Sequence, residues 1–166
     1  MSAITIRPET PADAERIHTL TQAAFRDMPF SDGDEQDVVD QLRADGDLTL
    51  SLVAEDAERI VGHIAFSPVT ISDGTQGWYG LGPVSVWPEL HGQGIGSRLI
   101  RRGIADMRTL GAKGVVLLGS TEFYPRFGFA HDPQLTYPGA PTEYFQCLVL
   151  EGAMPRGQVA YAPAFG

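Results

Sequence analysis

Three glycines at alternate positions separate a strand-like segment from a helix-like one. Gly92, Gly94 and Gly96 follow the apolar run 81–86, and from Ile95 onward apolar residues recur at helical spacing. A helix that begins after such a loop presents unpaired N–H groups and a partial positive charge, and glycines let a ligand approach the backbone closely. The spacing therefore predicts a loop that binds phosphate groups.

Two common nucleotide-binding loops do not fit this segment. A triphosphate-binding loop carries Lys and then Ser or Thr after its last glycine, whereas Ser97 and Arg98 follow Gly96. The dinucleotide-binding fingerprint needs a strand at the start of the chain and a downstream acid for the ribose, and neither is found in the required place. A phosphate ligand of another kind is therefore expected.

The residues around the loop resemble the acetyl-CoA pyrophosphate loop of the GNAT superfamily of N-acetyltransferases. The matching segment, His91-Gly92-Gln93-Gly94-Ile95-Gly96, follows Pro88 and leads into an amphipathic helix. Family members usually carry Gln or Arg where this chain has His91. The segments 80–84, 124–129 and 161–165 extend the resemblance along nearly the whole chain and to the YhbS-like branch of the family.

The resemblance implies which residues hold acetyl-CoA, with no metal. The backbone of Val84 and Val86, on either side of Ser85, would bind the pantetheine arm and the acetyl carbonyl. The N–H groups of the loop and first helical turn would hold the pyrophosphate; these residues are His91, Gly92, Gln93, Gly94, Ile95, Gly96 and Ser97. Arg98 could meet an outer phosphate, and Ser120 could replace an Asn that many relatives carry before the catalytic tyrosine.

The resemblance also assigns Tyr124 to the position of the general acid. A tyrosine, with a reference pKa of about 10, is protonated at neutral pH and can protonate a thiolate leaving group whose thiol has a pKa of about 8.5. The alternative is a structural tyrosine that packs on Phe123, Phe127 and Phe129.

The group that removes the proton from the acceptor amine stays open. Such a group is needed because an alkyl amine with a pKa near about 10 is mostly charged at pH 7. His63, Glu122, Glu35 or a chain of water molecules could serve, although a core histidine or a surface carboxylate is the simpler interpretation of each residue. Cys147 lies in a strand-like run without a paired histidine, which favours core packing over a nucleophilic role.

Length and composition exclude several classes of protein. The 166 residues suit one domain, 1–166, with 43% apolar and 20% charged residues. No apolar run approaches the ~20 residues that cross a bilayer, and the single cysteine suits a reducing compartment, so we expect a cytoplasmic protein without a membrane partner. The net charge of −9 argues against a nucleic-acid partner. The acidic segment 27–37 could attract an amine, but a solvated helix cap is the preferred interpretation.

Periodicity and turn residues predict the elements that position these side chains. The expected strands span residues 3–7, 48–55, 59–71, 78–86, 115–118, 144–150 and 159–161. Helices are expected after Thr10, from the cap 31–34 to Gly46, and after Ile95. This order, together with the resemblance, predicts an α/β fold with a mixed sheet of six to seven strands and about four helices. The fourth and fifth strands should be parallel and splayed.

These observations lead to two functional hypotheses. The first is an acetyl-CoA-dependent N-acetyltransferase that transfers the acetyl group directly to a small-molecule or peptide amine in a ternary complex. The second is a non-catalytic domain that binds or senses acyl-CoA. Transfer of a longer acyl group and assembly into a homodimer are both compatible with the sequence.

Overall fold

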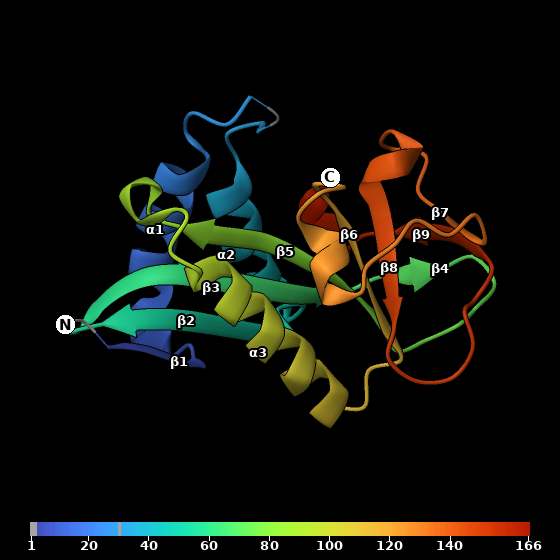
Figure 1. Ribbon diagram of the computed structural model, residues 1–166, viewed down its shortest axis with the longest axis horizontal. Coiled ribbons are helices and arrows are strands. Elements are labelled where there is room, and N and C mark those ends of the chain that lie inside the picture. The colour runs from blue at the N-terminus through green and yellow to red at the C-terminus, as the bar shows by residue number, and fades with distance from the viewer. Residues whose placement is uncertain (1–2, 30) are drawn as a thin grey trace.

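A six-stranded mixed sheet forms the centre of the computed structural model, which describes residues 3–29 and 31–166. Its strands are, in spatial order, β1 (Ile4–Pro8), β2 (Leu50–Asp56), β3 (Arg59–Pro68), β5 (Trp78–Val86), β6 (Gly114–Leu118) and β8 (Phe145–Val149) (Figure 1). The β5–β6 pair is parallel and the other four pairs are antiparallel. The predicted mixed α/β fold is therefore confirmed.

Helices cover both faces of this sheet. The α-helices are α1 (Ala14–Phe25), α2 (Glu35–Asp45) and α3 (Ile95–Thr109). The apolar stripe of α3 packs with Leu52 and Ile64, whereas α1 and α2 pack on Val53, whose side chain alternates to the opposite face of β2. The site residues of β5 thus lie between two different helical layers.

The described residues contain three α-helices, one fewer than the approximate four that we expected. After β6 the chain forms short 3-10 turns, the longest being Tyr124–Phe127. Pro125 lies in its first turn, and Gly128 ends it with φ +100°. Proline is tolerated in the first turn of a helix, whereas a left-handed glycine terminates one, so the turn ends at Gly128.

The predicted strand 59–71 is divided between two sheets. β3 ends at Pro68, and the short β4 (Thr70–Ile71) pairs instead with β9 (Gly157–Ala160). With β7 (Leu135–Thr136), these strands form a three-stranded sheet beside β8, at the right in Figure 1. The prediction of one continuous strand was wrong because the apolar residues after Pro68 serve a second core, between the small sheet and the end of the main one.

Throughout the described ranges, 3–29 and 31–166, none of the helices combines the length and the apolar character needed to cross a membrane.

Candidate active site

The parallel strands β5 and β6 pair over only three residues each. Trp78–Gly80 pairs with Gly114–Val116, while β5 continues to pair with β3 as far as Val86. Between Leu81 and Val84, β5 contains one residue more than the facing part of β3, and such a bulge bends a strand. The predicted splay is confirmed, and beyond Gly80 it leaves one edge of β5 without a neighbouring strand in the part of the chain that the structure describes.

The backbone groups of Val84 and Val86 point to this free edge. Trp87 N–H donates to the carbonyl of Val61 on the β3 side (3.2 Å), and successive residues of a strand direct their backbone groups to alternate sides. His91 Nε2 agrees with this assignment, because it donates to the carbonyl of Val86 from outside the sheet (2.8 Å). The free edge therefore offers donors and acceptors to an extended amide chain.

The glycine loop leaves its backbone uncovered. Gly92 and Gly94 adopt φ of +81° and +84°, and a Cβ placed on either would meet nothing within 4 Å. The first helical bond of α3 runs from Arg98 N–H to Gly94 C=O, so the N–H groups of residues 95–97 have no partner within the helix. The first turn of α3 also carries no acidic side chain. This loop suits a diphosphate.

A capped turn after β6 holds Tyr124. Ser120 Oγ accepts hydrogen bonds from the N–H groups of residues 122 and 123, at 3.1 Å each. Gln146 of β8 is buried, and its amide donates to the carbonyl groups of Gly119 (3.1 Å) and Ser120 (3.2 Å). The hydroxyl of Ser120, predicted to contact the cofactor, therefore lies within the turn that positions Tyr124.

Aromatic packing fixes the ring of Tyr124. The ring lies against Gly119, where a Cβ would collide with it, and meets Phe123 and Phe129 edge-on with centroids 5.1 and 6.1 Å apart. Burial raises the pKa of Tyr124, so its hydroxyl stays protonated at neutral pH. Tyr124 shares an apolar cluster with Val84 and Val86 at the free edge. The packed ring and the predicted acid are thus compatible, because packing orients the ring and the chemistry needs only its hydroxyl.

The arginines of α3 reach toward β1. Arg98 donates to the carbonyl of Ile4 (2.9 Å), and Arg102 donates to the carbonyl of Ile6 (3.1 Å). Arg101 lies over the ring of Phe127, 5.0 Å from its centroid. The bond to Ile4 uses one of the five N–H donors of the Arg98 guanidinium, so a phosphate would have to bind the remaining donors or replace the bond to β1.

Comparison with known proteins agrees with this geometry. The model of the acetyltransferase (GNAT) domain matches residues 5–131. The chain belongs to the GNAT acetyltransferase family. The Escherichia coli (strain K12) protein named uncharacterized N-acetyltransferase YhbS is 38% identical over 144 residues, which cover 84% of this chain and 83% of that protein. YjhQ of the same strain, also named an uncharacterized N-acetyltransferase, is 37% identical over 137 residues, which cover 80% and 72%.

Two solved GNAT structures resemble this fold over almost its whole length. A GNAT family acetyltransferase from Brucella melitensis in complex with acetyl-CoA is 51% identical, with a TM-score of 0.88 and 99% of both chains covered. Escherichia coli YhbS in complex with CoA is 34% identical, with a TM-score of 0.88 and coverage of 99% of this chain and 93% of that one. The predicted family and its YhbS-like branch are confirmed.

The three candidate bases of this GNAT domain lie in different environments. Glu122 is exposed in the turn before Tyr124, and Glu35 accepts a hydrogen bond from Ser31 Oγ (2.6 Å) at the start of α2. His63 is fully buried on β3, directly opposite Ser85 of β5. Burial lowers the pKa of His63 to about 4, so its imidazole is neutral at pH 7.

The structure adds polar residues that the sequence analysis missed. Glu9 and Arg43 form an ion pair (2.9 Å) beside Ser51 of β2, and Ser51 Oγ lies 2.7 Å from Nε2 of His63. One sequence feature could have marked these residues, namely a polar residue inside an otherwise apolar strand. Ser51, His63 and Gln146 all share this feature. Cys147 also lies inside a strand, but it is buried and its pKa is raised to about 11 by burial, in agreement with core packing.

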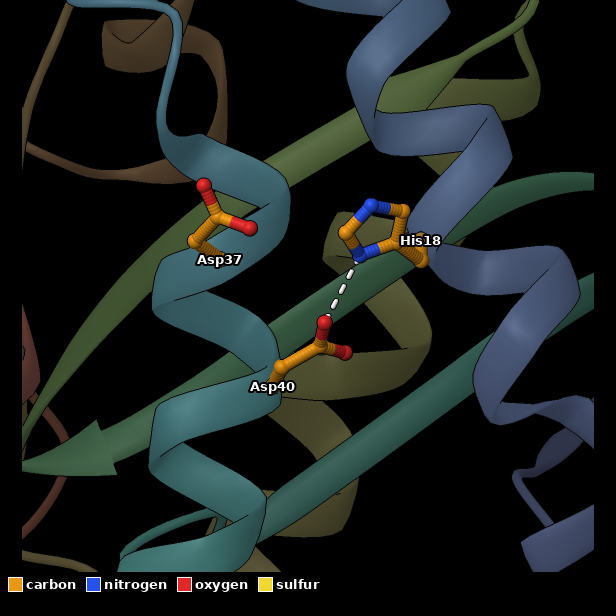
Figure 2. Close-up of side chains that lie close together, drawn as sticks. All are labelled: His18, Asp37 and Asp40. Carbon is orange, nitrogen blue, oxygen red and sulfur yellow. Dashed lines mark hydrogen bonds and ion pairs between the residues drawn. The ribbon is translucent and has the colours of Figure 1, made fainter.

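A group of potential metal ligands lies between α1 and α2. Figure 2 shows His18 of α1 facing Asp37 and Asp40 of α2, with one ligand atom of each within 4.8 Å of the others. His18 Nδ1 is 2.7 Å from Asp40 Oδ2, and Arg43 Nη1 is 3.4 Å from the other oxygen of Asp40. Asp40 thus already has two partners, and these contacts join the two helices.

Proposed function

We propose that this GNAT domain transfers the acetyl group of acetyl-CoA to a primary amine by direct attack in a ternary complex. The observation that carries the proposal is the free edge of β5, which leads into an uncovered glycine loop and shares an apolar cluster with Tyr124. The complexes of the Brucella relative with acetyl-CoA and of YhbS with CoA support the same cosubstrate.

The main chain supplies most of the proposed binding contacts. Bound acetyl-CoA would provide the acetyl group in the activated form of a thioester. The N–H and C=O groups of Val84 and Val86 would bind the pantetheine amides and orient the acetyl carbonyl. The N–H groups of the loop 92–97 would hold the diphosphate, with the positive end of α3 favouring its charge.

Tyr124 supplies the proton in the proposed reaction. Its O–H bond breaks as the departing sulfur of coenzyme A takes the proton, which makes the thiol a better leaving group than the thiolate. The raised pKa of Tyr124 keeps this proton in place at neutral pH. The phenolate formed in this step regains its proton from water before the next turnover.

Release of free coenzyme A during incubation with acetyl-CoA and a panel of amines tests the proposal. The panel should contain small alkyl amines, an amino sugar and peptides with free N-termini or lysines. Amine-dependent release above the rate of thioester hydrolysis is expected with at least one of them. Binding of coenzyme A in calorimetry without release for any amine would instead indicate the alternative, a domain that binds or senses acyl-CoA.

A further inference from the structure

Polar side chains, all buried except the half-buried Glu9, form a row across the face of the sheet that α1 and α2 cover. The row begins at Glu9, which follows β1, and continues through Ser51 of β2 and His63 of β3 to Ser85 of β5. Ser51 donates to Glu9 and lies 2.7 Å from His63, which is paired in register with Ser85. Ser85 donates to Thr21 of α1 (3.3 Å). The row therefore connects the outer edge of the sheet with the strand whose free edge holds the proposed thioester.

The hydrogen bonds determine where the protons of this row lie. Burial alone would raise the pKa of Glu9, but its bonds to Arg43 and Ser51 outweigh that effect, and its pKa is lowered. Glu9 is therefore ionised at neutral pH and can only accept hydrogen bonds. The single proton of Ser51 points to Glu9, so Ser51 Oγ accepts from Nε2 of His63. Nε2 consequently carries the ring proton, and Nδ1 has a free lone pair.

Nδ1 of His63 has no partner within residues 3–29 and 31–166. It is buried, and no hydrogen bond reaches it there. A buried acceptor without a partner is uncommon in native proteins and points to water or a ligand that completes it. The neighbouring strand is β5, about 4.8 Å away, and its free edge lies on the far side, so bridging water would connect an amine at that edge with this nitrogen.

The other end of the row opens to solvent. A surface cleft of about 320 Å³ is lined by Glu9, Arg43 and Ser51, together with Pro8 and Leu48 at the edge of the sheet. Arg43 holds both carboxylate oxygens of Glu9, at 2.9 and 3.0 Å. A proton delivered to Glu9 can therefore leave to water in this cleft.

We propose that His63, Ser51 and Glu9 form a relay that carries the proton of the acceptor amine from β5 to the cleft. The relay rests on the proposed acetyltransfer, since that reaction releases the proton. The N–H bond of the attacking amine breaks, and its proton passes through bridging water to Nδ1 of His63. The Nε2 proton passes to Ser51 Oγ, and the hydroxyl proton of Ser51 passes to Glu9, which releases it to water. Proton exchange with water after product release restores the starting tautomer.

The environment of His63 disfavours a doubly protonated imidazole, so the ring can pass a proton on but does not retain a second one. Glu9 raises the pKa of the imidazole and Arg43 of α2 lowers it. Ser85 of β5, opposite His63 in register, and Thr21 of α1, which Ser85 contacts, carry uncharged hydroxyls. Burial dominates, and the pKa of His63 falls to about 4. The ring is therefore neutral above about pH 5 and passes one proton on as it receives another.

The tautomer can be measured without any turnover. The chain has four histidines, so ¹⁵N NMR of histidine-labelled protein resolves few ring signals, and a His63→Gln variant identifies those of His63 by their loss. We expect a neutral ring with a proton on Nε2 and a bare Nδ1 at pH 7. A ring with its proton on Nδ1, or a doubly protonated ring at pH 7, would overturn the relay.

Kinetics with an active amine test the transfer itself. Ser51→Ala breaks the relay with little change in volume, and Ser67→Ala is the matched control, because Ser67 is a buried β3 hydroxyl without a hydrogen-bond partner among the described residues. We expect kcat at pH 7 to fall about 100-fold in Ser51→Ala and Glu9→Gln and to recover as pH rises, because hydroxide replaces the base. Ser67→Ala should keep the wild-type rate and pH profile.

Thermal unfolding and coenzyme A titration of each variant separate a broken relay from a damaged fold. An active wild-type protein whose Ser51→Ala and Glu9→Gln variants are folded and keep the wild-type pH profile would overturn the relay alone. A wild-type protein that binds coenzyme A but acetylates no amine would overturn the proposed function, and the relay with it.

Discussion

The free edge of β5 and the helix-covered face beside it are built from different parts of the chain. At the edge, the contacts offered to a ligand come from the main chain of Val84 and Val86 and from a loop that exposes its N–H groups. On the face, the contacts come from the side chains of Glu9, Ser51 and His63, which belong to three separate segments.

This difference determines how each region responds to substitution. A main-chain site depends on backbone conformation, so it tolerates most side chains but loses its shape where a left-handed glycine is replaced. A side-chain row depends on each polar partner, and removal of one leaves another buried group without a hydrogen bond. Variants of the two regions should therefore fail in different ways.

The largest effect is expected from Tyr124→Phe, which removes a side-chain function and leaves the main-chain site intact. We expect kcat to fall at least about 100-fold, because the leaving thiolate loses its acid. The affinity for coenzyme A in calorimetry should stay within a factor of two. Tyr137→Phe, a tyrosine of the second core, is the control and should retain wild-type turnover. Equal turnover of the two variants would remove the acid role from Tyr124.

A glycine substitution changes the main-chain site and leaves the hydroxyl of Tyr124 in place. Gly94→Ala should lower coenzyme A affinity about tenfold, since a non-glycine residue at φ +84° costs about 1–2 kcal/mol and shifts the loop out of its present conformation. Gly74→Ala is matched in backbone, with φ +86° and nothing within 4 Å of its Cβ, but it lies in the turn before β5. It should lose similar stability and no affinity. Equal affinities would show that the conformation of the loop is not what binds the diphosphate.

Acid should weaken the attachment of α1 to the sheet, because an ion pair joins Asp13, just before α1, to Arg7 of β1. Arg7 binds both oxygens of Asp13 at 2.8 and 3.1 Å, and this pairing lowers the pKa of Asp13 to about 2. A carboxylate whose pKa lies below its reference of about 3.9 stabilises the folded state above that pH and loses the contribution as pH falls toward 2. We expect about 2 kcal/mol of unfolding free energy to be lost between pH 4 and pH 2.

Urea unfolding at several pH values measures this loss, with Asp13→Asn as the reference variant. The variant should be less stable at neutral pH, because Arg7 loses a charged partner, and its stability should change less between pH 4 and pH 2. An identical pH dependence of the two proteins would assign the acid sensitivity to other carboxylates, of which Glu9 also has a lowered pKa.

The same contrast explains what could be predicted from the sequence. The glycine loop and the parallel pairing of β5 with β6 follow from local patterns and residue order, the resemblance to the family implied the splay, and the structure and the comparisons confirm them. Partners that are distant in the sequence could not be found in this way. Glu9 meets Ser51 across 42 positions and Gln146 meets Ser120 across 26, and nothing local to either residue marks its partner. Strand 59–71 was predicted as continuous because periodicity does not show which core an apolar residue joins.

The smallest effect is expected from Arg98→Gln, which tests where the two regions meet. The sequence suggested a phosphate contact, whereas the guanidinium donates to the carbonyl of Ile4 (2.9 Å). If that bond persists with ligand bound, the variant should bind coenzyme A less than about fivefold more weakly, with the same change for dephospho-coenzyme A, since one hydrogen bond contributes about 1 kcal/mol. A loss seen for coenzyme A and absent for the dephospho form would show that Arg98 contacts the outer phosphate. In that case the cofactor site would include a charged side chain as well as the main chain, and the contrast between the two regions would be weaker than the unliganded geometry indicates.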